Sequence, residues 1–232
     1  MSDKMKLCVS LDLESSKDNL QLVKEVKDYD VWLKVGFRSF LRDGKNFLED
    51  IKNINPNFKI FLDLKLYDIP NTMADAAYEI AKFGLVDMFN VHSSAGSLAM
   101  KTVMQRLEDI KNRPLVLAVT ALTSFDNDSF KAIYNDDISK KANEFAKSSF
   151  EAGLDGVVCS AYESLDIKKS TSNSFITLCP GIRPFGEDSG DQKRVANIDF
   201  AKENLVDFIV VGRPIYKSEN PKLVVEKILN NI

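Results

Sequence analysis

Hydrophobic and polar positions along the chain follow two periods that alternate from one end to the other. Short segments such as residues 7–13 alternate apolar side chains with polar or small ones, which is typical of a β-strand. Longer segments such as residues 16–27 repeat apolar side chains every three or four residues, which is typical of an amphipathic helix. The pattern predicts strands at 7–13, 31–37, 59–66, 86–92, 115–122, 156–160, 175–180 and 207–212, and helices at 16–27, 40–54, 71–83, 97–110, 139–152, 164–169, 200–205 and 221–230.

The alternation of strands and helices predicts a parallel sheet, either a closed (β/α)8 barrel or an open doubly wound sheet. We favour the barrel, as one domain over residues 1–232. The first helix lacks the G-x-G-x-x-G segment of a dinucleotide-binding sheet. Polar side chains also follow nearly every predicted strand, and only a closed ring brings all these strand ends to one centre. They are Asp12, Lys34, Asp63, Lys65, His92, Thr123 and Arg213.

The composition is that of a globular protein with a substantial core, since 44% of the residues are hydrophobic and 28% are charged. The net charge of -3 gives no reason to expect nucleic acid or an anionic membrane as a partner. No apolar run approaches the ~20 residues of a membrane span, and the N-terminal residues lead into a strand instead of a signal peptide. We therefore expect a cytoplasmic protein.

Cysteine and histidine residues are too few and too scattered for a zinc site. Cys8, Cys159 and Cys179 lie within apolar predicted strands, which indicates free buried thiols in a reducing compartment. His92 is the single histidine and ends the fourth predicted strand. There we expect a structural role at the barrel rim and assign no other.

The most informative segment is residues 61–72, where charged side chains follow directly after an apolar strand. Strand periodicity places Asp63 and Lys65 on one face. A lone Asp-x-Lys pair would most simply be a surface ion pair, which contributes little. Asp12 and Lys34 end the first two strands, so in a barrel all four charges should lie together at its mouth. There the carboxylates would keep Lys65 protonated and suited to act as a general acid.

Two turns that contain glycine and arginine follow the seventh and eighth predicted strands. They contain Gly181, Arg183, Gly212 and Arg213. In barrels of this kind these two turns commonly hold a phosphate, because glycine lets the backbone approach an anion and arginine matches its geometry. One such turn alone would be an ordinary turn with a surface arginine. Two of them after adjacent strands indicate a phosphate site.

Two further loops carry candidate binding groups. Residues 183–194 form a long loop that contains Gln192, and we interpret it as a lid that closes over a phosphate ester. A disordered acidic surface loop is the alternative. Thr123 follows the fifth predicted strand, where its hydroxyl could hydrogen-bond to the polar edge of a substrate, although threonine is also common in ordinary loops.

Together these residues resemble the orotidine 5'-phosphate decarboxylase family over essentially the whole chain. The most specific piece is the motif D-x-K-x-x-D-I-P-N-T, present without departure at residues 63–72. Small departures occur at residues 93–95 and 185–187, near the rim and the lid. The other matching segments follow in the family's order: the first strand with Asp12, then Lys34-Val-Gly36, Asn90-Val-His92, Leu122-Thr-Ser124, Pro180-Gly-Ile-Arg-Pro184, Gly190-Asp-Gln-Lys-Arg194 and Val211-Gly-Arg-Pro214.

The resemblance implies an enzyme that converts orotidine 5'-phosphate to uridine 5'-phosphate without a metal ion or an organic cofactor. It implies that Lys65 protonates C6 of the pyrimidine and that Asp63 lies against the carboxylate that leaves. Lys34 and Asp12 would complete the charged network and contact the ribose. The resemblance also implies that Thr123 lies near the edge of the pyrimidine. The 5'-phosphate would be bound by Arg183, Gln192, Gly212 and Arg213. Asp68 and Thr72 would reach the active site of the partner subunit in a homodimer.

Two other classes of protein remain open. A magnesium-dependent sugar-phosphate decarboxylase or aldolase of the same barrel superfamily, such as 3-keto-L-gulonate 6-phosphate decarboxylase or hexulose-phosphate synthase, also carries a D-x-K-x-x-D strand. The turn at residues 69–72 and the loop with Gln192 favour the orotidine enzyme. A non-catalytic phosphate-binding barrel is the second alternative, but such a protein has no need of Lys65.

Overall fold

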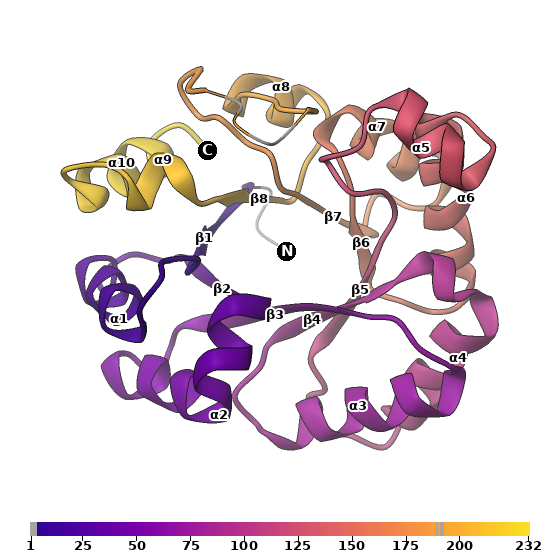
Figure 1. Ribbon diagram of the computed structural model, residues 1–232, viewed down its shortest axis with the longest axis horizontal. Coiled ribbons are helices and arrows are strands. Elements are labelled where there is room, and N and C mark those ends of the chain that lie inside the picture. Colours follow the sequence, from indigo (N-terminus) through magenta and orange to yellow (C-terminus); the bar gives the residue numbers. More distant parts are fainter. Residues whose placement is uncertain (1–3, 189, 191–192) are drawn as a thin grey trace.

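The computed structural model describes residues 4–188, 190 and 193–232, and it confirms the predicted (β/α)8 barrel. Eight parallel strands close in the order β1 to β8, with helices around them (Figure 1). The strands are β1 (Lys6–Ser10), β2 (Trp32–Gly36), β3 (Lys59–Leu66), β4 (Met88–His92), β5 (Leu115–Val119), β6 (Gly156–Val158), β7 (Ile176–Cys179) and β8 (Phe208–Val211). The helices are α1 (Ser16–Glu25), α2 (Phe37–Ile54), α3 (Pro70–Lys82), η1 (Ser93–Ala95), α4 (Ser97–Arg106), α5 (Asn127–Tyr134), α6 (Ile138–Glu151), α7 (Ala161–Ser170), α8 (Ile198–Glu203), α9 (Arg213–Tyr216) and α10 (Pro221–Leu229). No helix in the described part of the chain is both long enough and apolar enough to cross a membrane.

All eight predicted strands and all eight predicted helices are present, and most strands end one to three residues earlier than predicted. The sequence interpretation missed the short helices η1, α5 and α9. Helix α5 lies in a segment that reads as a polar loop because its start is rich in capping residues. Asp126 Oδ1 accepts the backbone N–H of Ser129 at 2.8 Å. Phe130 is fully buried and packs in a small apolar cluster with Ala121 and Ile138, which holds this helix against the segments on either side of it. Within the helix, its ring stacks on that of Tyr134 with centroids 4.4 Å apart.

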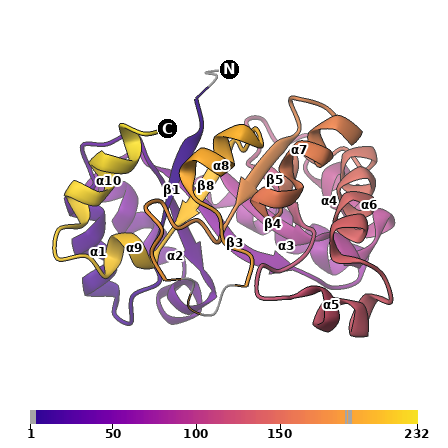
Figure 2. The ribbon, with the colours of Figure 1, turned by 90° about the horizontal axis from the view of Figure 1, so that it is seen from above.

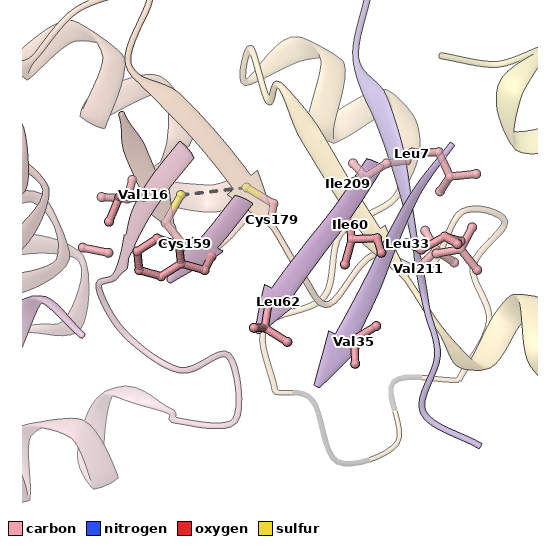
Figure 3. Close-up of a cluster of buried hydrophobic side chains, with 14 of the residues drawn as sticks. Leu7, Leu33, Val35, Ile60, Leu62, Val116, Cys159, Cys179, Ile209 and Val211 are labelled. Atoms are coloured by element: carbon pink, nitrogen blue, oxygen red, sulfur yellow. Dashed lines mark hydrogen bonds between the residues drawn. The ribbon is translucent and has the colours of Figure 1, made fainter. Parts of the chain in front are cut away.

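Buried apolar side chains form two layers, one between the barrel and the helices and one inside the barrel. Figure 3 shows part of the outer layer, in which Leu33 and Val35 of β2 pack beside Ile60 and Leu62 of β3. The inner layer consists of Cys8, Phe61, Met88, Leu117, Val119, Val158, Leu178, Phe208 and Val210. Successive residues of a strand alternate between the layers, so inward-facing positions at the strand ends open onto the barrel mouth.

The three cysteines are buried free thiols, as predicted. Cys159 and Cys179 lie on neighbouring strand ends with their Sγ atoms 3.8 Å apart (Figure 3). Hydrogen bonding between these two thiols, together with burial, raises the pKa of Cys159. Burial also raises the pKa of Cys8 inside the barrel. Cys8 and Cys159 are therefore protonated packing groups and not thiolate nucleophiles.

Three aspartates lie directly before β4, β6 and β8, and each connects its strand to the preceding strand of the barrel. Asp87, Asp155 and Asp207 each accept a backbone N–H from the preceding strand. The donors are Ile60 at 2.9 Å, Val116 at 2.7 Å and Thr177 at 2.8 Å, and the paired cations are Lys52, Arg113 and Lys168. These contacts lie at the end of the barrel where the N-terminus emerges, whereas α5 and the loop after β7 lie at the opposite end (Figure 2).

Candidate active site

A cavity of about 270 Å³ opens at the C-terminal ends of the strands. Phe61, Leu178 and Val210 of the inner core layer form part of its lining. Eight residues that were predicted from the sequence also line it: Asp12, Lys34, Asp63, Lys65, Thr123, Arg183, Gly212 and Arg213. The predicted contact at Gln192 lies outside the described residues. The closed barrel thus brings candidates from six different strand ends to one place.

Asp12, Lys34, Asp63 and Lys65 form a continuous row of alternating charges, which confirms that they lie near one another. Lys34 Nζ lies 3.1 Å from Asp12 Oδ1 and 3.5 Å from Asp63 Oδ2. Lys65 Nζ lies 2.6 Å from Asp63 Oδ1. We call these four residues the charge array. Two ammonium groups balance two carboxylates, so the array places opposite charges at the barrel mouth without adding net charge.

Burial and pairing have opposite effects on the two inner members of the charge array. Burial by itself lowers the pKa of Lys34, but Asp63 and Asp12 outweigh it, so the pKa is raised above its ordinary value. Burial by itself raises the pKa of Asp63, but Lys34, Lys65 and the amide of Asn90 outweigh it, so the pKa is lowered. Both groups are therefore held ionised at neutral pH although little solvent reaches them.

The end of β3 departs from regular strand geometry where it carries the charge array. The ladder with β4 is regular up to Leu62 and resumes at Leu66. Over this interval β3 advances by four residues while β4 advances by only two, so β3 forms a bulge. Within this bulge Lys65 has a φ of 48°, in the left-handed region that residues other than glycine rarely adopt. Because the insertion is even, Lys65 still faces the cavity together with Asp63, as strand periodicity predicted.

Asn90 on β4 is a site residue whose importance the sequence interpretation missed. Its side chain is fully buried. Its Oδ1 accepts the backbone N–H of Lys65 at 2.7 Å, and its Nδ2 donates to Asp63 Oδ1 at 2.8 Å. The available signal was an amide side chain within an apolar strand, two residues after Met88 and therefore on the same inward face.

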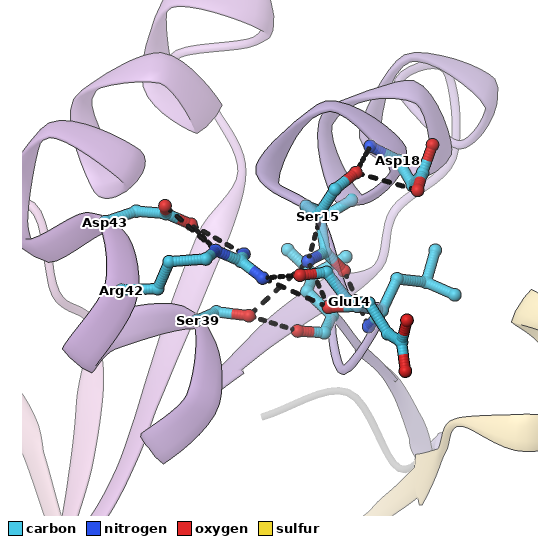
Figure 4. Close-up of polar contacts among 9 residues, drawn as sticks. Glu14, Ser15, Asp18, Ser39, Arg42 and Asp43 are labelled. Carbon is cyan, nitrogen blue, oxygen red and sulfur yellow. Dashed lines mark hydrogen bonds and ion pairs between the residues drawn. The ribbon is translucent and has the colours of Figure 1, made fainter.

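The loop that carries Asp12 after β1 is held by polar contacts to α2 (Figure 4). Ser39 Oγ donates to the carbonyl oxygen of Leu11 at 2.7 Å. Arg42 donates from its guanidinium to the carbonyl oxygen of Glu14. These two contacts fix the backbone on both sides of Asp12, so its carboxylate is supported independently of Lys34.

Gly212 and Arg213 join β8 to the short helix α9. A Cβ atom at Gly212 would lie 3.2 Å from side-chain atoms of both Ser10 and Tyr216, so any side chain there would displace its neighbours. Gly190 in the loop after β7 has a φ of 62° and packs directly on the guanidinium of Arg213, where a Cβ atom would clash. The loop after β7 therefore packs against the end of the neighbouring strand β8.

Arg183 is buried at the base of the same loop. Its backbone N–H donates to the carbonyl oxygen of Ala196 at 2.8 Å. Its guanidinium donates from Nε to the carbonyl oxygen of Asp188 at 2.6 Å and from Nη1 to that of Ile182 at 3.1 Å. Arg183 thus orders the loop in addition to lining the cavity.

Thr123 links the loop after β5 to the end of the loop after β7. Its carbonyl oxygen accepts the backbone N–H groups of Lys193 at 3.1 Å and Arg194 at 3.3 Å. Arg194 also pairs with Glu163, whose side chain is only 3% exposed. Burial raises the pKa of Glu163 even though Arg194 opposes that shift. The sequence did not reveal this pair, because its members lie far apart along the chain and share no motif.

Asp68 and Thr72 do not line the cavity of their own chain. Both are exposed, and Asp68 Oδ1 accepts the backbone N–H of Ile69 at 2.7 Å. Large apolar side chains are exposed in the same sector, after β2, β3 and β4. They are Phe37, Leu41, Tyr67, Ile69 and Leu98, which we call the apolar rim. Five of the eleven large apolar residues that are exposed in the described part of the chain therefore follow these three strands.

His92 ends β4 at the barrel mouth. Its ring packs against that of Tyr67 with centroids 5.6 Å apart, and its Nδ1 lies 2.7 Å from Ser94 Oγ. Burial, followed by the nearby Lys65, lowers the pKa of His92. The imidazole is therefore neutral at pH 7 and holds the start of η1, in agreement with the structural role expected for it.

Comparisons with known proteins match the fold and nearly the whole chain. The family model described as "Orotidine 5'-phosphate decarboxylase / HUMPS family" matches residues 5–228. "Orotidine 5'-phosphate decarboxylase" of Nitratiruptor sp. is 68% identical over 98% of this chain and 100% of the relative, and that of Sulfurimonas denitrificans is 67% identical over the same shares. The crystal structure of orotidine 5'-phosphate decarboxylase from Lactobacillus acidophilus is similar with a TM-score of 0.84 and 31% identity, over 98% of this chain and 99% of that one. This chain therefore belongs to the orotidine 5'-phosphate decarboxylase / HUMPS family.

Proposed function

We propose that this chain decarboxylates orotidine 5'-phosphate to uridine 5'-phosphate and carbon dioxide. The observation that carries the proposal is the charge array in a cavity that is also lined by Arg183 and Arg213. A substrate anchored there through its phosphate can present its pyrimidine to the array. The two relatives that are 68% and 67% identical are named orotidine 5'-phosphate decarboxylase.

The difficult step is the loss of carbon dioxide from an sp2 carbon that has no adjacent electron sink. The C6–carboxylate bond breaks and its electron pair remains on C6. The Lys65 ammonium stabilises this charge and donates a proton from Nζ to C6, and solvent later restores that proton. A preorganised charge aimed at developing charge is usually the largest catalytic contribution. Asp63 lies against the substrate carboxylate, and the repulsion between them is relieved as carbon dioxide leaves.

The rest of the cavity binds the parts of the substrate that do not react. Arg183, Gly212 and Arg213 bind the phosphate together with Gln192, while Thr123 faces the edge of the pyrimidine. Lys34 and Asp12 contact the ribose hydroxyls. These contacts lie far from the bond that breaks, so their binding energy can close the loop after β7 and hold the pyrimidine in place. Glycine at 212, where a side chain would displace Ser10 and Tyr216, supports a close approach of the backbone to the phosphate.

The active unit in this proposal is a homodimer in which Asp68 and Thr72 complete the partner's site. The apolar rim supports it, since each of its five side chains is more than half exposed, from 51% at Phe37 to 79% at Leu41. Asp68 and Thr72 lie in the same sector and outside the cavity of their own chain. A second copy seated on this sector would bury the rim and bring these two residues to the neighbouring mouth.

Mixing inactive subunits tests the shared site. A heterodimer of Lys65→Ala and Asp68→Ala subunits contains one site with both lesions and one site with neither. We expect it to recover about half of the wild-type activity per dimer, whereas each variant homodimer stays nearly inactive. Purified heterodimers that show no recovery would contradict the proposal that Asp68 acts across the interface.

The proposed setting is the cytoplasm, with a nucleotide substrate and with neither nucleic acid nor a membrane as a partner. Three buried free thiols support a reducing compartment. The net charge of -3 offers no attraction to polyanions.

The reaction itself is tested by following the loss of ultraviolet absorbance of orotidine 5'-phosphate in the presence of EDTA. We expect rapid turnover by the wild type and near-complete loss in Lys65→Ala, with folding retained by circular dichroism. Both carboxylates of the charge array are paired with ammonium groups, which favours chemistry without a metal. Turnover that requires magnesium would favour the sugar-phosphate class, and a wild type that decarboxylates nothing with or without magnesium would refute the proposed function.

A further inference from the structure

We propose that Asn90 is a positioning residue for the decarboxylation: its amide holds the backbone of Lys65 and the carboxylate of Asp63 in the one arrangement that aims the ammonium into the cavity. This inference rests on the proposed function. Asn90 does not line the cavity, so it acts on the substrate only through these two residues.

The need for such a residue arises from the bulge in β3. Between Leu62 and Leu66 the ladder with β4 is interrupted, so the residues in between lack regular partners on β4. Lys65 sits within this interruption with a φ of 48°. Residues other than glycine adopt this backbone conformation only where the surrounding structure enforces it. The backbone N–H of Lys65 also needs an acceptor, because an unpaired buried donor is costly.

The amide of Asn90 meets both needs at once. Its Oδ1 accepts the Lys65 N–H at 2.7 Å, and its Nδ2 donates to Asp63 Oδ1 at 2.8 Å. A backbone N–H can only donate and an ionised carboxylate can only accept, so the orientation of the amide is unambiguous. Aspartate in this place could not donate when ionised, and alanine could do neither.

The consequence for the catalytic pair follows from the carboxylate of Asp63. Its Oδ1 accepts from both Asn90 Nδ2 and Lys65 Nζ, the latter at 2.6 Å, while its Oδ2 faces Lys34 at 3.5 Å. Asn90 therefore sets which carboxylate oxygen faces the ammonium of Lys65. Without the amide, the carboxylate can turn towards Lys34 and the bulge can relax, which moves Nζ away from its place.

The test compares Asn90→Ala with the wild type in the ultraviolet assay. A misplacement of about 1 Å can reduce the rate about 100-fold, so we expect kcat to fall by about that factor. The KM for orotidine 5'-phosphate should change much less, because the proposed phosphate contacts come from β7 and β8. The acid limb of the kcat profile should move to higher pH, since Asp63 loses a hydrogen bond that favours its ionised form.

A second variant keeps the test decisive if Asn90→Ala folds poorly. Asn90→Asp is nearly isosteric and retains an acceptor for the Lys65 N–H, but its carboxyl group donates to Asp63 only when protonated. We expect the ratio of the Asn90→Asp kcat to the wild-type kcat to rise as the pH falls from 8 to 5. Thr177→Val is the matched control, because it removes buried hydrogen bonds at the other end of the barrel, where Thr177 contacts Ser164 and Asp207.

We expect Thr177→Val to lower the melting temperature while kcat stays within about twofold of the wild type. The positioning role is overturned if folded Asn90→Ala keeps kcat within threefold, or if Asn90→Asp shows a pH profile of the wild-type shape. These outcomes are distinct from failure of the proposed function, in which the wild type itself would not decarboxylate orotidine 5'-phosphate.

Discussion

Replacement of Lys34 by methionine should destabilise the protein because Lys34 is the cation between two carboxylates. Its Nζ lies 3.1 Å from Asp12 Oδ1 and 3.5 Å from Asp63 Oδ2. The side chain of Asp63 is 14% exposed and that of Asp12 is 40% exposed, so Asp63 bears most of the loss. Methionine has a similar length and no charge, so the variant leaves Asp63 with Lys65 and removes the ammonium group that lies against Asp12.

The magnitude follows from the burial of this pair. Removing one partner of a buried ion pair costs about 3–5 kcal/mol, and the partial exposure of Asp12 favours the lower end, about 3 kcal/mol. For a chain of this length each kcal/mol lowers the melting temperature by about 2–4 °C, which gives a decrease of about 6–12 °C at pH 7.

The destabilisation should depend on pH in a defined direction. In the wild type the pKa of Asp63 is lowered, so its contribution to stability is present above the unfolded pKa and is lost as the pH falls through the folded pKa. Lys34→Met removes a cause of that lowered pKa. The difference in the free energy of unfolding between the variant and the wild type should therefore be largest near pH 7. It should shrink below about pH 4, where carboxyl groups take up protons.

A double-mutant cycle in urea unfolding measures the pair directly. We expect Lys34→Met combined with Asp63→Asn to be less destabilised than the sum of the two single variants, by about 1–3 kcal/mol, because no strongly buried charge is left unpaired. Additivity within about 0.5 kcal/mol, or a melting temperature that Lys34→Met leaves unchanged, would refute the electrostatic reasoning.

Two further predictions concern contacts outside the charge array. Arg194→Met leaves the carboxylate of Glu163 buried without its cation, so the free energy of unfolding in urea at pH 7 should fall by about 3 kcal/mol. This loss should become smaller at lower pH, where Glu163 takes up a proton. An unchanged unfolding midpoint would contradict this prediction. Asp207→Ala removes the partner of Lys168, whose side chain is 4% exposed, and should cost about 2 kcal/mol in the same measurement. Because Asp207 lies at the end of the barrel opposite the cavity, kcat should stay within about twofold, and a large loss of kcat would show that the two ends are coupled.

Periodicity along the chain was sufficient for the architecture. Alternation with period two and period 3.6 marks every strand and every long helix, because burial on one face imposes a repeat that a single sequence displays. It failed for α5, whose capping residues Asp126 and Ser129 are those of an ordinary loop. The helix exists because Phe130 has a place to pack, and that place belongs to other segments of the chain.

The members of the charge array could likewise be identified from the amino-acid sequence alone. Asp12, Lys34, Asp63 and Lys65 are charged residues at strand ends, where a buried core gives no reason for them, and a closed barrel has only one mouth. Arg183, Gly212 and Arg213 followed from the same reasoning about strand ends. For Asp68 and Thr72 the chain by itself shows only that they are exposed beside the apolar rim.

The barrel, the identity of the charged residues and the strand ends that carry them could all be predicted from the amino-acid sequence, because each depends on local periodicity. The directions in which these charged side chains point depend on contacts between segments that are far apart along the chain. The bulge at Lys65, the amide of Asn90 that supports it and the ion pair between Arg194 and Glu163 each join segments that are distant in sequence. Such contacts depend on distances across strands, and a periodic pattern along one strand contains no information about the strand beside it.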